Sequence, residues 1–86
     1  MTTPRPQRAA GLELNEADDG MIVFQESTDR VHHLNPTAAV ILELCDGTRT
    51  SGEIAAAVAE VFGLASPPEA ETAGCLEDLA REGLIA

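Results

Sequence analysis

The segment over residues 31–50 constrains the fold most, because it holds a complete passage from extended chain into a helix and out again. Asn35 can cap a helix with its side-chain oxygen, and Pro36 suits the first helical position, where no N–H is needed. Asp46-Gly47 is a typical helix stop. We therefore predict a largely buried helix over residues 36–45.

Two further helices are predicted downstream. Thr50 and Glu53 have the spacing of a capping box, in which side chains and backbone satisfy two N–H groups reciprocally. With Gly63 as a C-cap, this box predicts a helix over residues 51–62. A third helix is expected to start in the Ser66-Pro67-Pro68-Glu69 segment and to end near residue 82, and Leu84-Ile85 is expected to fold back onto the core.

The apolar positions of these helices recur every three or four residues and define faces directed toward a core. We expect these faces to comprise Ala38, Val40, Ile41, Leu42, Leu44 and Cys45 in the first helix, Ile54, Val58, Val61 and Phe62 in the second, and Ala73, Leu76, Leu79 and Ala80 in the third.

The residues before the helices favour extended structure. Leu12-Glu13-Leu14 alternates like a short strand, and strand-forming residues fill 21–26 and 30–34. Short turns separate the three segments, which predicts an antiparallel meander. The fold class is therefore α+β and winged-helix-like, with a three-stranded antiparallel sheet followed by three helices. Residues 1–11 show no periodic pattern and are expected to form a flexible tail, and residues 12–86 form one domain.

The charge of the chain restricts its partners. Its 86 residues include 15 Asp and Glu against 5 Arg and no Lys, for a formal net charge of −10. Nucleic acids and anionic membranes attract basic patches, so neither is an expected partner. A basic peptide or a basic protein surface suits this chain better, although an excess of carboxylates also serves solubility alone.

Compartment and chemistry are indicated by what the sequence omits. We find no signal peptide and no apolar run long enough to span a bilayer, so we expect a cytoplasmic protein. Cys45 and Cys75 lie at apolar positions of predicted helices, as buried cysteines often do, and a disulfide is not expected in a reducing compartment.

His32 and His33 are neighbours on a strand and point to opposite faces, so they cannot share a metal ion. We expect one to face the core and the other to face solvent or a peptide.

Catalytic motifs are not evident. We find no phosphate-binding loop, no Cys-x-x-Cys pair and no nucleophile with an evident base. The chain is therefore expected not to be an enzyme, and no cofactor is expected.

Three motifs resemble a known family. They are Leu34-Asn35-Pro36-Thr37-Ala38 at the strand-to-helix junction, Asp46-Gly47-Thr48 between helices, and Leu79 with Gly83-Leu84-Ile85 at the end. Together they resemble the PqqD-like peptide chaperones, or precursor-peptide recognition elements, over about residues 12–86. The resemblance implies a non-catalytic domain that binds the leader of a ribosomally made precursor peptide and presents it to a modifying enzyme. A radical SAM enzyme is the expected partner, and pyrroloquinoline quinone (PQQ) biosynthesis is one possible pathway. The chain departs from the family at Leu42, where many relatives carry Trp.

A peptide site follows from the edge of the sheet. Residues 30–34 form the last strand in sequence order, and an edge strand offers unpaired N–H and C=O groups to an added peptide strand. The resembling family places the third helix beside this strand, so Val31 and His33 are expected to face a helical wall. The expected peptide-binding residues are Arg30, Val31, His32, His33 and Leu34 on the strand and Thr72, Cys75, Leu76 and Leu79 on the helix, with Glu71, Asp78 and Glu82 at the rim attracting Lys or Arg of the leader.

Two other classes of protein are also small and helix-rich. An acyl or peptidyl carrier protein needs an Asp-Ser-Leu-type site for phosphopantetheine, and none of Ser27, Ser51 and Ser66 lies in one. A mass increase with a phosphopantetheinyl transferase would support it. A winged-helix DNA-binding module needs a basic recognition helix, whereas residues 51–62 carry Glu53 and Glu60 and no Arg or Lys. Retention on duplex DNA at moderate salt would support that class.

Overall fold

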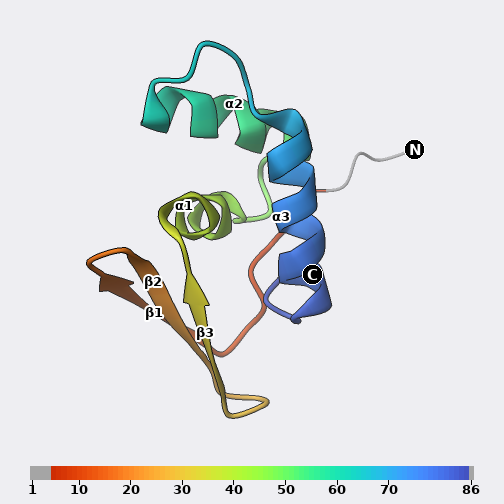
Figure 1. Cartoon of the computed structure of the whole chain (residues 1–86). Helices are drawn as coiled ribbons and strands as arrows, with labels where there is room; N and C mark the ends of the chain where they lie inside the picture. Colours follow the sequence, from red (N-terminus) through yellow and green to blue (C-terminus); the bar gives the residue numbers. More distant parts are fainter. Residues whose placement is uncertain (1–4, 86) are drawn as a thin grey trace.

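Three strands precede three helices in the computed structural model, which describes residues 5–85 (Figure 1). This order confirms the predicted α+β fold. Helix α1 lies between the sheet and α2, and α3 packs beside both helices (Figure 1). The elements are β1 (Leu12–Ala17), β2 (Gly20–Gln25), β3 (Arg30–Leu34), α1 (Pro36–Leu44), α2 (Ser51–Phe62) and α3 (Glu69–Arg81).

The starts of α1 and α2 are capped as their sequences predict. The Asn35 Oδ1 atom accepts a hydrogen bond from the Ala38 N–H at 2.8 Å. In the capping box, the Glu53 N–H donates to Thr50 Oγ1 at 3.2 Å and the Thr50 N–H donates to Glu53 Oε1 at 2.9 Å. Helix α3 begins at Glu69, the last residue of the segment in which its start was expected, because a residue before proline disfavours the helical conformation.

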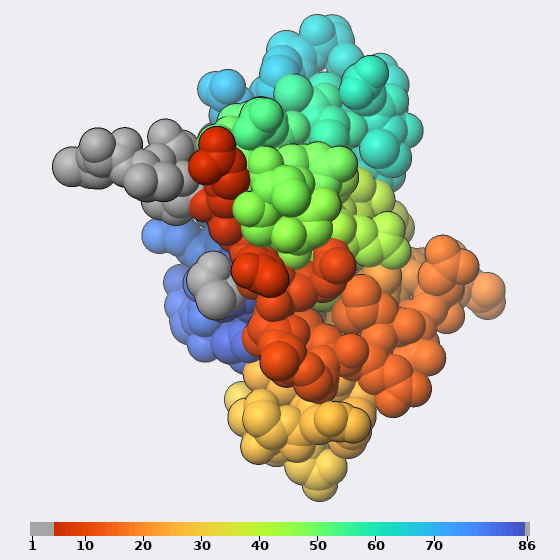
Figure 2. Space-filling model, turned by 180° about the vertical axis from the view of Figure 1, so that it is seen from behind, coloured from red at the N-terminus to blue at the C-terminus, as the bar shows by residue number. Residues whose placement is uncertain are grey.

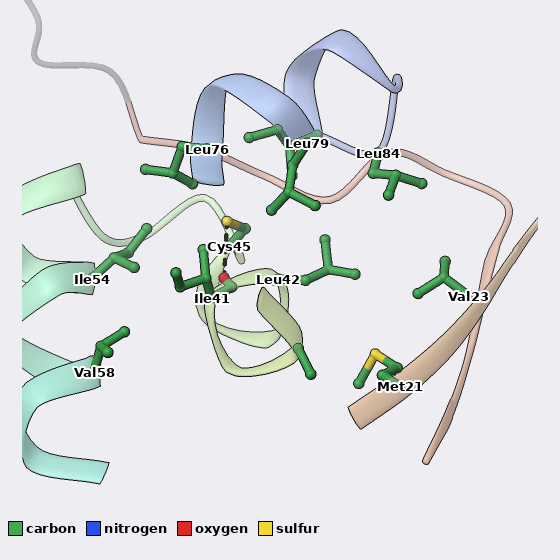
Figure 3. Close-up of a cluster of buried hydrophobic side chains, with 12 residues drawn as sticks. Met21, Val23, Ile41, Leu42, Cys45, Ile54, Val58, Leu76, Leu79 and Leu84 are labelled. Carbon is green, nitrogen blue, oxygen red and sulfur yellow. Dashed lines mark hydrogen bonds between the residues drawn. The ribbon is translucent and has the colours of Figure 1, made fainter. Parts of the chain in front are cut away.

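The sheet is an antiparallel meander in the order β1-β2-β3. β1 is longer than expected, because Asn15–Ala17 continue the pairing with β2 up to the two-residue turn. Met21 and Val23 of β2 point from the sheet toward Leu42 of α1 and Leu84 (Figure 3). The core thus joins one face of the sheet to the helices.

The buried face of each helix differs in part from the predicted one. Ile41, Leu42, Ile54, Val58, Leu76 and Leu79 are buried as expected. Val61 and Phe62 are wrong as core positions, because their exposed fractions are 60% and 41%. Ala73 and Ala80 are also exposed, and Thr72 is buried in their place.

The end of the chain returns to the core, as predicted. Gly83 adopts a left-handed φ of 75° after α3, a conformation that glycine reaches without a steric penalty. The Leu84 N–H then donates to the Leu79 carbonyl at 2.9 Å. Leu84 and Ile85 are consequently 1% and 8% exposed.

The expected flexible tail is in part an ordered strap. Residues 1–4 lie outside the described residues, but residues 6–9 run across the junction between α1 and the C-terminal end (Figure 2). The Arg8 N–H donates to the Cys45 carbonyl at 2.8 Å, and the Ala9 N–H donates to the Leu84 carbonyl at 2.9 Å. A free tail is therefore wrong for residues 6–9, because these backbone groups find partners far along the chain.

Within residues 5–85, no helix has the length and apolar character needed to cross a membrane.

Candidate functional site

β3 forms one edge of the sheet, as expected from its place in the sequence. β2 pairs with one side of it, and no other strand of the described chain pairs with its opposite side. β3 is the strand nearest α3 (Figure 1), and residues of both elements line one groove. β3 thus offers the free backbone that strand addition requires.

The hydrogen-bond pattern of the first two strands fixes which β2 groups point to β3. Ala17 and Gly20 close a two-residue turn, and the Glu26 N–H donates to the Gly11 carbonyl at 3.1 Å at the other end of the ladder. In an antiparallel pair, hydrogen-bonded residues alternate with residues that point away. The even-numbered β2 residues therefore bond β1, and the odd-numbered residues 21, 23 and 25 point to β3.

The same alternation assigns the backbone groups of β3. The odd-numbered residues of β2 are opposite Leu34, His32 and Arg30, which therefore bond within the sheet. The N–H and C=O groups of Val31 and His33 consequently point outward from the free edge. These two residues are the positions at which an added strand would form its hydrogen bonds.

The side chains of β3 alternate in the opposite sense to our expectation. Residues directly opposite each other on two strands share a face, so His32 lies on the same face as the buried Val23. The His32 side chain is only 10% exposed, whereas that of His33 is 57% exposed. This confirms that one histidine faces the core and one faces solvent. Val31 is 66% exposed and shares the outer face with His33, so the side chains that face the helices are those of His32 and Leu34.

A groove of about 750 Å³ lies between β3 and α3. Its lining combines apolar side chains with two carboxylates of α3 and that of Glu82, which follows the helix. The residues that line it are Val31, His32, His33, Leu34, Asn35, Thr37, Ala38, Glu71, Gly74, Cys75, Asp78, Leu79, Glu82 and Leu84.

Most of the sequence-predicted binding residues meet in this groove, but three do not. Thr72 and Leu76 are 1% and 8% exposed, because this side of α3 packs into the core. Arg30 lies outside the lining, and its guanidinium is 3.9 Å from the carboxylate of Glu82. The remaining six, Val31, His32, His33, Leu34, Cys75 and Leu79, line the groove.

Sequence reasoning missed the part of the lining that α1 contributes. Asn35, Thr37 and Ala38 line the groove because the first turn of α1 directly follows β3. Gly74 was also missed, although it lies one helical turn from Glu71 and Asp78. The spacing of three and four residues along α3 was the available signal.

The helical wall of the groove is acidic. Asp78 forms an ion pair with Arg81 at 2.9 Å, and Glu82 lies 3.9 Å from both Arg30 and the His32 Nδ1 atom. Apart from His32, these residues are substantially exposed, so the ion pairs of Asp78 with Arg81 and of Glu82 with Arg30 contribute little to stability. The carboxylates give the groove a charge that suits a basic peptide.

The two thiols are free and differ in position. Cys45 is fully buried, donates to the Ile41 carbonyl at 3.1 Å (Figure 3), and has a pKa raised to about 11 by burial. Cys75 lines the groove, and burial, with a smaller contribution from the charge of Asp78, raises its pKa as well. In the described part of the chain, no three His, Cys, Asp or Glu residues are placed to hold a metal ion.

The strand order, the three helices and the open edge beside α3 define a small winged-helix-like α+β domain with a groove for an extended ligand. The sequence pattern of the family described as "Coenzyme PQQ synthesis protein D (PqqD)" matches residues 20–85. The chain therefore belongs to the PqqD family. Among curated proteins, none matches the chain.

Two solved structures share this fold. The structure described as "Lasso peptide synthetase B1 complexed with the leader peptide" has a TM-score of 0.76 and 16% sequence identity, over 95% of this chain and 98% of that chain. The structure described as "TbiB1 in Complex with the TbiA(beta) Leader Peptide" has a TM-score of 0.75 and 18% identity, over 92% of this chain and 93% of that chain. At these identities, the similarity establishes the fold.

Proposed function

We propose that this protein is a non-catalytic adaptor, which binds the leader of a ribosomally made precursor peptide as a fourth strand along β3 and presents it to a modifying enzyme. The observation that carries this proposal is the free edge of β3, where the backbone groups of Val31 and His33 point outward beside the groove. Membership of the PqqD family and the leader peptides in the two similar structures support it.

The energetics of strand addition fit this edge. Each new backbone hydrogen bond contributes roughly 0.5–1.5 kcal/mol net, and alternate side chains of the added strand face α3. Those side chains meet Cys75 and Leu79, with Asp78 and Glu82 beside them. The expected ligand is therefore a leader in which every second residue faces α3 and is apolar or basic, while the residues between them face solvent.

A proline scan of β3 tests the proposal. Val31→Pro removes an N–H that points outward, so the sheet keeps its own hydrogen bonds, and edge strands tolerate proline. The probe is a synthetic leader from the short precursor peptide that the neighbouring genes are expected to encode. Titration calorimetry is expected to show about a tenfold loss of affinity, because one hydrogen bond is lost and a carbonyl of the leader is left without a partner. Wild-type affinity of Val31→Pro would contradict strand addition at this edge.

Two controls separate the backbone from other effects. Val31→Thr keeps the N–H and nearly the same shape, so it is expected to bind like wild type. His32→Pro removes an N–H that points toward β2, so it is expected to weaken folding itself, as measured by thermal unfolding.

The nature of the partner enzyme and the compartment belong to this proposal. We expect a radical SAM enzyme in the cytoplasm, acting in PQQ biosynthesis or in a related peptide pathway. The neighbouring genes are expected to encode a short precursor peptide and a radical SAM enzyme. Reconstitution of this protein with such an enzyme tests this: the adaptor is expected to accelerate modification of the full precursor, and to have no effect on a precursor without its leader.

A further inference from the structure

The backbones of the two walls of the groove do not approach each other closely. No Cα atom of β3 lies within 8 Å of a Cα atom of α3, although both elements pack against α1. Side chains make the connection at one end of the groove. The Gln25 Nε2 atom donates to the Gly83 carbonyl at 3.2 Å, and the His32 Nε2 atom lies 3.0 Å from Gln25 Oε1.

Gln25 uses its whole amide in this connection. The side chain is 5% exposed, and its orientation follows from the Gly83 carbonyl, which can only accept. Gln25 Oε1 then accepts from the Thr28 hydroxyl at 2.9 Å and from His32. His32 must therefore donate through Nε2, while its Nδ1 atom lies 3.9 Å from the Glu82 carboxylate.

Resting on the proposed function, we propose that Gln25 and His32 are positioning residues that set the width of the peptide groove. We call the linked Gln25, His32 and Gly83 carbonyl the clamp. It ties β2 and β3 to the end of α3, so the clamp fixes how far the helical wall stands from the free edge. The width of the groove in turn limits the size of the side chain that a bound peptide places against Cys75 and Leu79.

A measurement without peptide tests the clamp by itself. In long-range ¹H–¹⁵N NMR spectra at neutral pH, His32 is expected to be the Nε2–H tautomer. Gln25→Leu is expected to shift the amide signals of Cys75 and Leu79, because the helical wall moves. A Nδ1–H tautomer in wild type, or unshifted signals in Gln25→Leu, would overturn the clamp whether or not the protein binds leaders.

Peptide selection tests its effect on binding. The probe is a peptide selected from a random displayed library by wild-type protein, with Val31→Pro used for counter-selection. Gln25→Leu and His32→Leu are expected to weaken its binding by about tenfold or more. Thr28→Val removes the neighbouring hydrogen bond to Gln25 without touching α3 or the groove lining. Its binding is expected to stay within about threefold of wild type.

The identity of the selected residues separates positioning from mere folding. A second selection on folded Gln25→Leu is expected to enrich a different size of residue at the position that faces α3. Enrichment of the same residues by both proteins would overturn the proposal. If wild type selects no peptide, strand addition fails, and the NMR result still decides the clamp.

Discussion

Gly20 shows at the residue scale how tightly the sheet is closed next to α1. Its φ is 147°, and a Cβ atom there would lie 1.9 Å from the Leu34 carbonyl oxygen. Backbone atoms cannot yield as a flexible side chain can, so β2 and β3 would have to separate. The start of α1, and with it one side of the groove, depends on this glycine.

Gly20→Ala is expected to lower the free energy of unfolding by about 2–4 kcal/mol, because it combines a steric clash with a strained φ. Urea unfolding followed by circular dichroism measures the change. Gly74→Ala is the matched control, since nothing lies within 4 Å of its Cβ position in α3. It is expected to raise the free energy of unfolding by about 0.5–1 kcal/mol. Equal stability of Gly20→Ala and wild type would show that the strands do not meet this closely.

Cys45 gives the protein an alkaline stability limit. Its pKa is about 11 in the folded state against 9.0 for an ordinary thiol, so the unfolded chain loses its proton first as the pH rises. The contribution of the protonated Cys45 thiol to the stability of the folded state is complete below pH 9.0, and it is lost as the pH rises from 9.0 to about 11. Few other groups interfere, because the chain has no Tyr and no Lys.

The urea concentration at which half of the protein is unfolded is therefore expected to decrease when the pH is raised from about 8 to about 10.5. Cys45→Ala is expected to be less stable at the lower pH, because it leaves a cavity, and to lose less stability between the two. The smaller alkaline loss that remains is assigned to Cys75. An identical pH slope in wild type and Cys45→Ala would contradict the role of the thiol.

At the scale of elements, the strap at residues 6–9 adds to the C-terminal cap of α1, where the Cys45 N–H donates to the Leu42 carbonyl. Helix α1 ends without a basic residue in its last turn, and Cys45 follows it in a non-helical conformation. The Arg8 guanidinium supplies the donors, at 3.2 Å from the Leu42 carbonyl and 2.6 Å from the Glu43 carbonyl. A cation at the C-terminal end of a helix also interacts favourably with the helix dipole, whose negative end lies there.

Arg8→Ala is expected to lower the free energy of unfolding by about 1–2 kcal/mol, because the Glu43 carbonyl loses its side-chain donor and the Leu42 carbonyl keeps only the Cys45 N–H. Thermal unfolding measures the loss. Arg5→Ala is the control, since this substitution removes the same charge at an exposed residue. A matching loss in both variants would mean that net charge, and not the cap, is responsible.

At the scale of the whole molecule, charge and groove act together. A formal net charge of −10 attracts a basic leader over a distance, and the carboxylates of α3 meet it at the groove. Long-range attraction is screened by salt, whereas strand pairing is not. Association rate and residence time are therefore expected to depend on different parts of the protein.

The double variant Glu71→Gln and Asp78→Asn is expected to slow association of the synthetic leader by about tenfold at low salt, and by less at high salt. Stopped-flow fluorescence with a labelled leader measures this. Glu43→Gln and Glu60→Gln make the same change in net charge away from the groove between β3 and α3. An equal slowing by both double variants would show that only the total charge matters.

The sequence by itself determined the local elements and their order. Asn35, the Thr50–Glu53 box and the period-two pattern of the strands act between residues close in the chain, so their effects are readable without a fold. The edge position of β3 also followed, because consecutive strands joined by short turns pair in order. Family membership was carried by the same local motifs.

Only the tertiary structure decided which face of each element meets which neighbour. Gln25 bonds Gly83 across 58 positions, and Arg8 bonds Leu42 across 34. Such contacts depend on the sum of all packing in the molecule, and no neighbouring residue signals them. For the same reason, the register of the sheet turned His32 rather than Val31 toward the helices, and packing buried Thr72 in place of Ala73. Short-range chemistry specifies the elements, and the mutual fit of distant surfaces specifies the site.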